Sequence, residues 1–236
     1  MNPDNHQIAF LHTARAHIRT FDALLDKRGQ SSNEKISVRH DVDEALLSDA
    51  VRLGLTPEII ARTEQAITNA GNSGARIIIC TCSTLGAIAE AFDSQTKATV
   101  IRIDRPMADL AVTRGQQILI VAALASTLTP TRALLATSAH NLGKSPTLNT
   151  LLLPNCWAHF LAGDEQTYLE TIATRIEQIE ADQKDSPDLI VLAQASMATA
   201  ADLCTGTQIP ILGSPDTGIA AALDLLRSFD DGSDNE

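Results

Sequence analysis

The chain has 236 residues, which is long for one ordinary domain and short for two full ones. Its composition, 44% hydrophobic and 20% charged, is sufficient for a large buried core and excludes a disordered polymer. A net charge of −11 and an aromatic set of five Phe, one Trp and one Tyr exclude a nucleic-acid-binding protein. Such a chain repels phosphates and has few rings on which bases could stack.

A membrane partner is not expected either. No apolar stretch approaches the roughly 20 residues that span a bilayer, and the start, MNPDNHQIAF, lacks the basic and apolar segments of a secretory signal. The four cysteines are too scattered for a disulfide framework, and the Cys80/Cys82 pair lacks the second pair that a zinc site requires. We therefore expect a cytoplasmic protein that uses no metal.

Eight apolar segments of strand length alternate with amphipathic segments, a pattern typical of βαβ units and parallel sheets. The expected strands are residues 7–11, 35–39, 76–80, 99–103, 118–122, 148–153, 188–192 and 209–212. The expected helices are residues 44–53, 58–71, 133–139, 168–183, 198–204 and 218–229.

The sequence also contains an internal repeat. QIAFLHT from Gln7 matches QILIVAA from Gln117, the segment around Cys82 matches the segment around Gln194, and Pro106 matches Pro215. The three matches keep the same order and nearly the same offset, which indicates two copies of a four-stranded unit. We expect residues 1–106 and 208–236 to form the first α/β half and residues 107–207 the second, with the last strand returning to the first half.

Open parallel sheets bind ligands beyond the carboxyl ends of their strands, where loops lead into helices. If two such halves face each other, the expected site is the cleft between them. The residues at these strand ends are His12, Thr13, Cys82, Ser83, Thr84, Ser126, Thr127, Gln194, Ala195 and Ser196.

Cys82 is the strongest candidate for chemistry. It follows an apolar strand and precedes the helical pattern AIAEAF, so helix N–H groups are expected to lower its pKa and to hold a substrate carboxylate. A free cysteine is more often a small buried hydrophobe, but the flanking Thr81, Ser83 and Thr84 favour the functional interpretation. Cys80, on the strand itself, is expected to be a core residue.

Four segments together resemble the aspartate/glutamate/hydantoin racemase superfamily. They are IIICTCSTLG around Cys82, ILIVAALAST at the start of the second half, LIVLAQASM around Gln194, and IPILGSP as the last strand. The resemblance covers nearly the whole chain and implies two facing α/β halves, each a four-stranded parallel sheet flanked by helices. It also implies a racemase-like isomerase that needs no cofactor.

Members of that family typically use two cysteines, one in each half, as base and acid on opposite faces of a carbon next to a carboxylate. Cys82 matches the first cysteine, with Ser83 and Thr84 at the positions that bind the anion. Gln194 stands where the second cysteine is expected. A glutamine amide cannot exchange a proton near neutral pH, so two-thiol racemisation is not expected here.

His12 ends the first strand, where the family keeps a polar group near the first cysteine. It could deprotonate Cys82 or supply a second proton, or it could bond a backbone carbonyl without a catalytic role. Thr13, Ser126 and Thr127 could contact the substrate or cap helices. His40 and Asp43 could face the cleft, although Asp43 also fits a helix cap. Arg102 and Arg105 could attract a diacid or be solvated at the surface, and we expect the surface position.

Two classes of function remain open. One is an isomerase or racemase-like enzyme acting on a small carboxylate, an amino acid or a diacid, with a one-cysteine decarboxylase or lyase as its variant. The other is a protein that binds small carboxylates without turnover. The thiol at Cys82 favours the enzyme and the glutamine at 194 favours the binder; a homo-oligomer is compatible with both.

Overall fold

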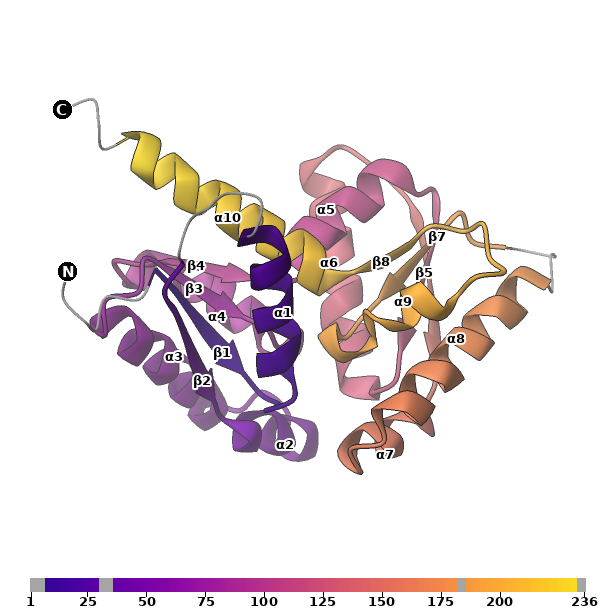
Figure 1. Ribbon diagram of the computed structural model, residues 1–236, viewed down its shortest axis with the longest axis horizontal. Coiled ribbons are helices and arrows are strands. Elements are labelled where there is room, and N and C mark those ends of the chain that lie inside the picture. Colours follow the sequence, from indigo (N-terminus) through magenta and orange to yellow (C-terminus); the bar gives the residue numbers. More distant parts are fainter. Residues whose placement is uncertain (1–6, 30–35, 182–185, 233–236) are drawn as a thin grey trace. The chain divides into compact units, whose positions relative to one another are not determined.

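The computed structural model describes residues 7–29, 36–181 and 186–232. The chain divides into two compact units. Unit 1 comprises Met1–Asp104 and Pro215–Glu236, and unit 2 comprises Arg105–Ser214. Each unit contains one four-stranded parallel sheet flanked by helices, as the sequence predicts (Figure 1).

The sheet of unit 1 has the strand order β2-β1-β3-β4. Its strands are β1 (Ile8–His12), β2 (Val38–Val42), β3 (Ile77–Cys80) and β4 (Thr99–Arg102). The helices of this unit are α1 (His17–Gly29), α2 (Glu44–Leu53), α3 (Pro57–Asn72), α4 (Gly86–Phe92) and α10 (Ser214–Gly232). The register pairs Leu11 with Cys80, so the residues that follow these two strands lie side by side.

The sheet of unit 2 has the order β6-β5-β7-β8, which repeats the order of unit 1. Its strands are β5 (Gln117–Ala122), β6 (Thr147–Leu152), β7 (Leu189–Leu192) and β8 (Ile211–Gly213). Its helices are α5 (Arg105–Arg114), α6 (Leu128–Asn141), α7 (Cys156–Leu161), α8 (Glu165–Ala181) and α9 (Ala200–Leu203). The repeat seen in the sequence is thus a repeat of topology.

Burial explains why the central strands form. Every residue of β3 (IIIC) and of β7 (LIVL) is buried, because helices cover both faces of a parallel sheet and leave no polar face. Cys80 belongs to this core, as expected. In unit 2, Met107 and Val112 of α5 pack in one cluster with Ile118 and Ile120 of β5.

The last strand corrects one prediction. Residues 209–212 were expected to return to the first half, but β8 pairs with β7 in unit 2, with Ile190 opposite Ile211. The chain returns to unit 1 at Pro215, the match of Pro106. Helix α10 therefore returns to the first half, and strand β8 does not. Strands are tied to their neighbours by backbone hydrogen bonds, whereas a helix associates through its apolar face and can pack elsewhere.

All eight strands lie within a few residues of their expected positions. Three helices, α1, α5 and α7, were not expected. The segment HIRTFDALLDKRG of α1 has few apolar residues, and only Phe21 and Leu25, one turn apart, are buried hydrophobics. Residues 182 and 183 of the helix expected at 168–183 lie outside the described residues.

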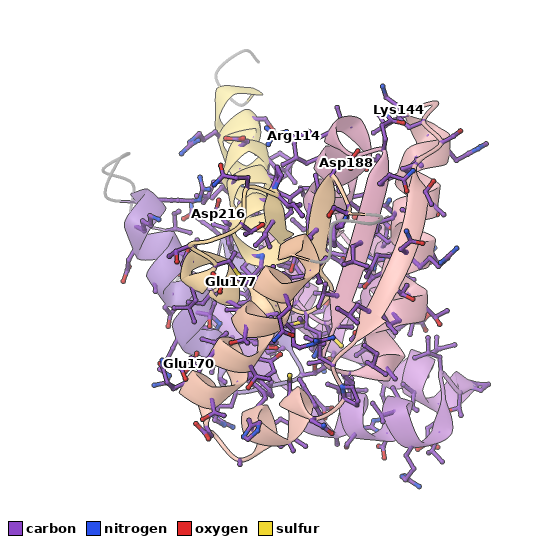
Figure 2. All side chains as sticks on the ribbon, turned by 90° about the vertical axis from the view of Figure 1, so that its right-hand side faces the viewer. Arg114, Lys144, Glu170, Glu177, Asp188 and Asp216 are labelled. Carbon is purple, nitrogen blue, oxygen red and sulfur yellow. The ribbon has the colours of Figure 1, made fainter. Side chains whose placement is uncertain are left out.

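Carboxylates hold two loops of unit 2 in place (Figure 2). Asp188 accepts hydrogen bonds from the N–H groups of Gln116 and Gln117 just before and at the start of β5. Glu177 of α8 accepts from the N–H groups of Thr205 and Gly206, which precede β8. These bonds satisfy backbone donors that the sheet itself leaves unpaired.

Among the helices of the described ranges, none combines the length and the apolar character needed to cross a membrane.

Candidate active site

Cys82 lies in the loop between β3 and α4. Because β1 and β3 are parallel neighbours with Leu11 opposite Cys80, this loop runs beside His12 and Thr13 at the end of β1. The Thr81 N–H continues the ladder by donating to the Leu11 carbonyl at 3.1 Å. Cys82 is 6% exposed, and Ser83 and Thr84 are equally buried.

Three donors surround the Cys82 sulfur. The Thr13 hydroxyl and the backbone N–H groups of Thr84 and Leu85 all lower its pKa, and the Leu85 N–H also donates to the Cys82 carbonyl at 3.1 Å. Each of these donors favours the thiolate, because a donor stabilises the negative charge. The loop thus stabilises a negative charge on the sulfur.

The resting charge of Cys82 differs from the sequence prediction. Burial raises its pKa above the ordinary value, with a smaller contribution in the same direction from the Asp104 carboxylate. The three donors oppose this rise without cancelling it. The prediction of a lowered pKa is therefore wrong for the free protein, because it counted the donors and not the loss of water around the sulfur.

The Thr84 hydroxyl, two residues after Cys82, is buried and has no hydrogen-bond partner in the part of the chain that the structure describes. An unpaired buried hydroxyl costs free energy unless a ligand or water completes it. A carboxylate oxygen is a suitable acceptor for this group. Thr84 therefore has a hydroxyl that no described residue bonds.

His12 is fully buried at the end of β1. Its Nδ1 lies 2.8 Å from Thr81 Oγ1 and its Nε2 lies 2.8 Å from Nδ1 of His40 on β2. Burial, together with the charges of His17 and His40, lowers its pKa to about 3. The ring is therefore neutral at pH 7, and both of its nitrogens bond to groups other than the Cys82 sulfur.

Strand β2 and the residue that follows it contribute a helix N-cap, Asp43, and a histidine that joins two other side chains, His40. Asp43 is the N-cap of α2, where its carboxylate accepts from the Leu46 N–H at 3.2 Å, so the capping alternative is confirmed. His40 instead bridges two residues: its Nδ1 faces His12 and its Nε2 lies 2.9 Å from Asp22 Oδ1 on α1. Sequence reasoning missed Asp22, because nothing in the sequence indicated that α1 would cover this end of the sheet.

Arg102, at the end of β4, was expected at the surface and is 3% exposed. Its guanidinium forms two bonds to Asp104, at 2.7 and 3.1 Å, and this pairing makes the burial of the charge possible. A side chain at Gly86 would come within 2.9 Å of the guanidinium carbon. Gly86 therefore allows the ion pair to lie against the start of α4, next to the Cys82 loop.

In unit 2, Gln194 follows β7 as Cys82 follows β3. Its side-chain oxygen accepts from the N–H groups of Ala123 at 2.7 Å and Leu124 at 3.0 Å, in the loop after β5. The two donors fix which end of the amide is oxygen, since its nitrogen could not accept them. Gln194 thus secures the loop of the neighbouring strand.

Of the other candidate residues of unit 2, two have side chains that form hydrogen bonds within the unit. Thr127 donates to the Leu124 carbonyl at 2.7 Å, and the Ser196 hydroxyl lies 2.9 Å from the hydroxyl of Tyr168. Ala195 is buried and offers no polar side chain. The Ser126 Oγ is buried without a hydrogen-bond partner among the described residues, like the hydroxyl of Thr84 in unit 1.

Within the described ranges, no three His, Cys, Asp or Glu residues are grouped so that they could hold a metal ion.

No family model matches the sequence, and no curated protein sequence does. The fold, in contrast, matches solved structures. A glutamate racemase from Bacillus anthracis superposes with a TM-score of 0.67 at 14% identity, over 95% of this chain and 83% of that one. An allantoin racemase from Klebsiella pneumoniae has a TM-score of 0.64 at 18% identity, over 94% and 88%.

A maleate isomerase from Pseudomonas putida, solved with maleate, has a TM-score of 0.62 at 12% identity, over 93% of this chain and 92% of that one. All three matches cover both units of the chain. The chain therefore shares the fold of these two racemases and this isomerase, which is the fold that the resemblance in its sequence implies.

Proposed function

We propose that the chain is a cofactor-independent, racemase-like isomerase that acts on a small carboxylate, an amino acid or a diacid, through the single thiol of Cys82. The observation that carries this proposal is the surroundings of the sulfur. Three hydrogen-bond donors, from Thr13, Thr84 and Leu85, converge on it in a buried loop. A cysteine that served only as a core residue would have no use for them.

The chemistry follows from the charge of the sulfur. Cys82 rests as a thiol, because burial raises its pKa. The reactive thiolate forms when this thiol gives its proton to water, and the same three donors stabilise the thiolate. A thiolate can remove a proton from the carbon next to a carboxylate, and the thiol so formed can return it. The Thr84 hydroxyl, unpaired among the described residues, would donate to a substrate carboxylate.

Gln194 limits the reaction to one thiol. Its amide cannot deliver a proton, and its oxygen is already bonded to two backbone N–H groups. We therefore propose that a single sulfur both removes and returns the proton, which suits a one-base isomerisation better than symmetric racemisation. In a one-cysteine decarboxylation, the Cys82 thiol would instead give its proton to the carbon that loses CO2.

Binding without turnover is the second candidate. It is favoured by the raised pKa of Cys82, which leaves little thiolate in the free protein at pH 7. In that case the loop amides and the Thr84 hydroxyl would hold a carboxylate, and no bond would change.

Incubation in D2O with a panel of amino acids and dicarboxylic acids distinguishes the two candidates. We expect deuterium at the carbon next to a carboxylate, or a product isomer, for at least one substrate. The Cys82→Ala variant should lose this exchange at least a hundredfold, because no other group of the loop can carry the proton.

The matched control is Cys204→Ala. Cys204 is a half-buried thiol of unit 2 that bonds backbone carbonyls, so its removal should leave exchange unchanged. Binding of a substrate by calorimetry without exchange, isomerisation or release of CO2 would establish the binder. Equal loss of exchange in both variants would show that Cys82 has no special role.

A further inference from the structure

A continuous chain of hydrogen bonds runs from the loop of Cys82 to the surface of unit 1. It joins Thr81 Oγ1 to His12 Nδ1 at 2.8 Å, His12 Nε2 to His40 Nδ1 at 2.8 Å, and His40 Nε2 to Asp22 Oδ1 at 2.9 Å. Exposure increases along it, from the buried Thr81 and His12 through the His40 side chain at 14% to the Asp22 side chain at 53%. We propose that His40, anchored by Asp22, is a positioning residue that sets which nitrogen of His12 carries its proton and thereby the direction of the Thr81 hydroxyl.

The argument begins at the acidic end. The Asp22 carboxylate can only accept, so His40 Nε2 carries a proton. When His40 is neutral, its Nδ1 is an acceptor and His12 Nε2 must carry the proton between the rings. His12 Nδ1 is then an acceptor as well, so the Thr81 hydroxyl donates to it.

A proton added at His40 Nδ1 would reverse the two bonds that join His40, His12 and Thr81 without moving a heavy atom, while His40 Nε2 would still donate to Asp22. His40 Nδ1 then donates to His12 Nε2, so the proton of His12 moves to Nδ1 and is donated to Thr81 Oγ1. The Thr81 hydroxyl needs another acceptor, and the Leu11 carbonyl lies 3.2 Å from it. The chain therefore has two complete bonding patterns, and the charge of His40 selects between them.

The surroundings of His12 explain why its own ring stays neutral. His12 packs against the rings of Phe10, Phe21 and His17, and it is fully buried. Among the described residues, His17 lies against the ring of His12 and Asp22 bonds His40. His17 also stays neutral, since burial lowers its pKa to about 4, and the Asp22 carboxylate bonds His40.

Thr81 directly precedes Cys82 in the loop, so a change in its hydroxyl direction alters the field next to the sulfur. This relevance to catalysis rests on the proposed function, whereas the change of tautomer does not. His12 becomes a positioning residue on this view, because both of its nitrogens bond to Thr81 and His40.

The test is a pH titration of the full chain with 15N-labelled histidine, in which the ring nitrogens are followed by NMR. Above the transition we expect His12 to be neutral with its proton on Nε2. As the pH falls, His40 should become an imidazolium, and at the same midpoint His12 should stay neutral and change to the Nδ1–H form. The His40→Gln variant assigns the His40 signals and should abolish the change at His12.

Two variants of α1 sharpen the test. Asp22→Asn keeps an acceptor but removes the charge that holds the His40 proton on Nε2, so we expect a smaller fraction of His12 in the Nε2–H form. Asp26→Asn removes the same charge one helical turn away and should leave the tautomer of His12 unchanged. The proposal is overturned if His12 keeps one tautomer while His40 titrates, or if His12 itself becomes an imidazolium at that midpoint.

The outcome is independent of the proposed function. A tautomer change without deuterium exchange would overturn the proposed enzyme activity and support the proposed role of His40. Deuterium exchange without a tautomer change would support the enzyme activity and overturn the proposed role of His40.

Discussion

The side-chain oxygen of Gln194 accepts a hydrogen bond from the N–H group of Ala123 at 2.7 Å, and a second from Leu124. The equivalent position in unit 1 is Cys82, whose sulfur bonds the hydroxyl of Thr13. Cys82 follows β3 in unit 1, and Gln194 follows β7 in unit 2. In both units, this residue contacts the loop that follows the first strand of the unit, β1 or β5. Gln194 therefore has a structural role of its own, since its two hydrogen bonds to Ala123 and Leu124 correspond to the contact between Cys82 and Thr13 in unit 1.

This contact predicts the effect of removing the oxygen. Gln194→Met keeps the shape of the side chain and leaves two backbone donors unpaired, so we expect a loss of about 2 kcal/mol in the free energy of unfolding by urea. Hydrogen exchange of the Ala123 and Leu124 amides should accelerate. Gln178→Met, at an exposed site of α8, should change the free energy of unfolding by less than about 0.5 kcal/mol. Unchanged exchange in Gln194→Met would refute the structural role.

The pKa of Cys82 can be followed by alkylation. Because burial raises this pKa, the rate of reaction with iodoacetamide should rise with pH through a midpoint above that of a free cysteine. Thr13→Val removes a donor to the thiolate and should move the midpoint higher still. Thr68→Val, a threonine of α3 that bonds its own helix, is the control and should leave the midpoint unchanged. A midpoint below that of a free cysteine would restore the prediction of an activated thiol.

The fold was predictable because its main signals are local. Continuous apolar runs mark β3 and β7, and a repeat of constant offset indicates two equal units. The place where the chain changes units was not predictable from the apolar runs, since IPILG satisfies a strand in either sheet. The match of Pro106 with Pro215 was the signal that could have located it.

The site was predictable only as a set of residues at strand ends. Cys82, Thr13 and His12 lie together because β1 and β3 are neighbours, which the repeat implies. Their charges were not predictable, because pKa values depend on burial and on partners such as Asp22, which comes from a helix that the sequence pattern did not indicate. Arg102 shows the same limit, since its burial depends on Asp104.

The buried histidines predict how stability depends on pH. Burial lowers the pKa from 6.5 to about 3 for His12 and to about 4 for His17, so the unfolded chain takes up protons that the folded chain does not. Stability should therefore fall as the pH decreases from 6.5 to 5, by up to about 1.4 kcal/mol per pH unit for each group. His17→Gln should remove one such contribution from the slope, measured by urea unfolding. His140→Gln, at an exposed position of α6, should leave the slope unchanged; equal slopes in all three proteins would show that His17 is not buried in its neutral form.

Two helical glycines predict opposite effects of the same substitution. A Cβ at Gly218 of α10 would overlap the carbonyl oxygen and side chain of Ile103, which follows β4. Gly218→Ala should therefore cost roughly 1–3 kcal/mol, because backbone atoms must move. At Gly71 of α3 the nearest atoms would be those of Ile78 at 3.7 Å and Thr96 at 3.9 Å, which is ordinary contact. Gly71→Ala should stabilise the chain by up to about 1 kcal/mol, since alanine favours the helix. Urea unfolding of both variants measures the difference, and effects of the same sign would show that α10 does not approach the end of β4 this closely.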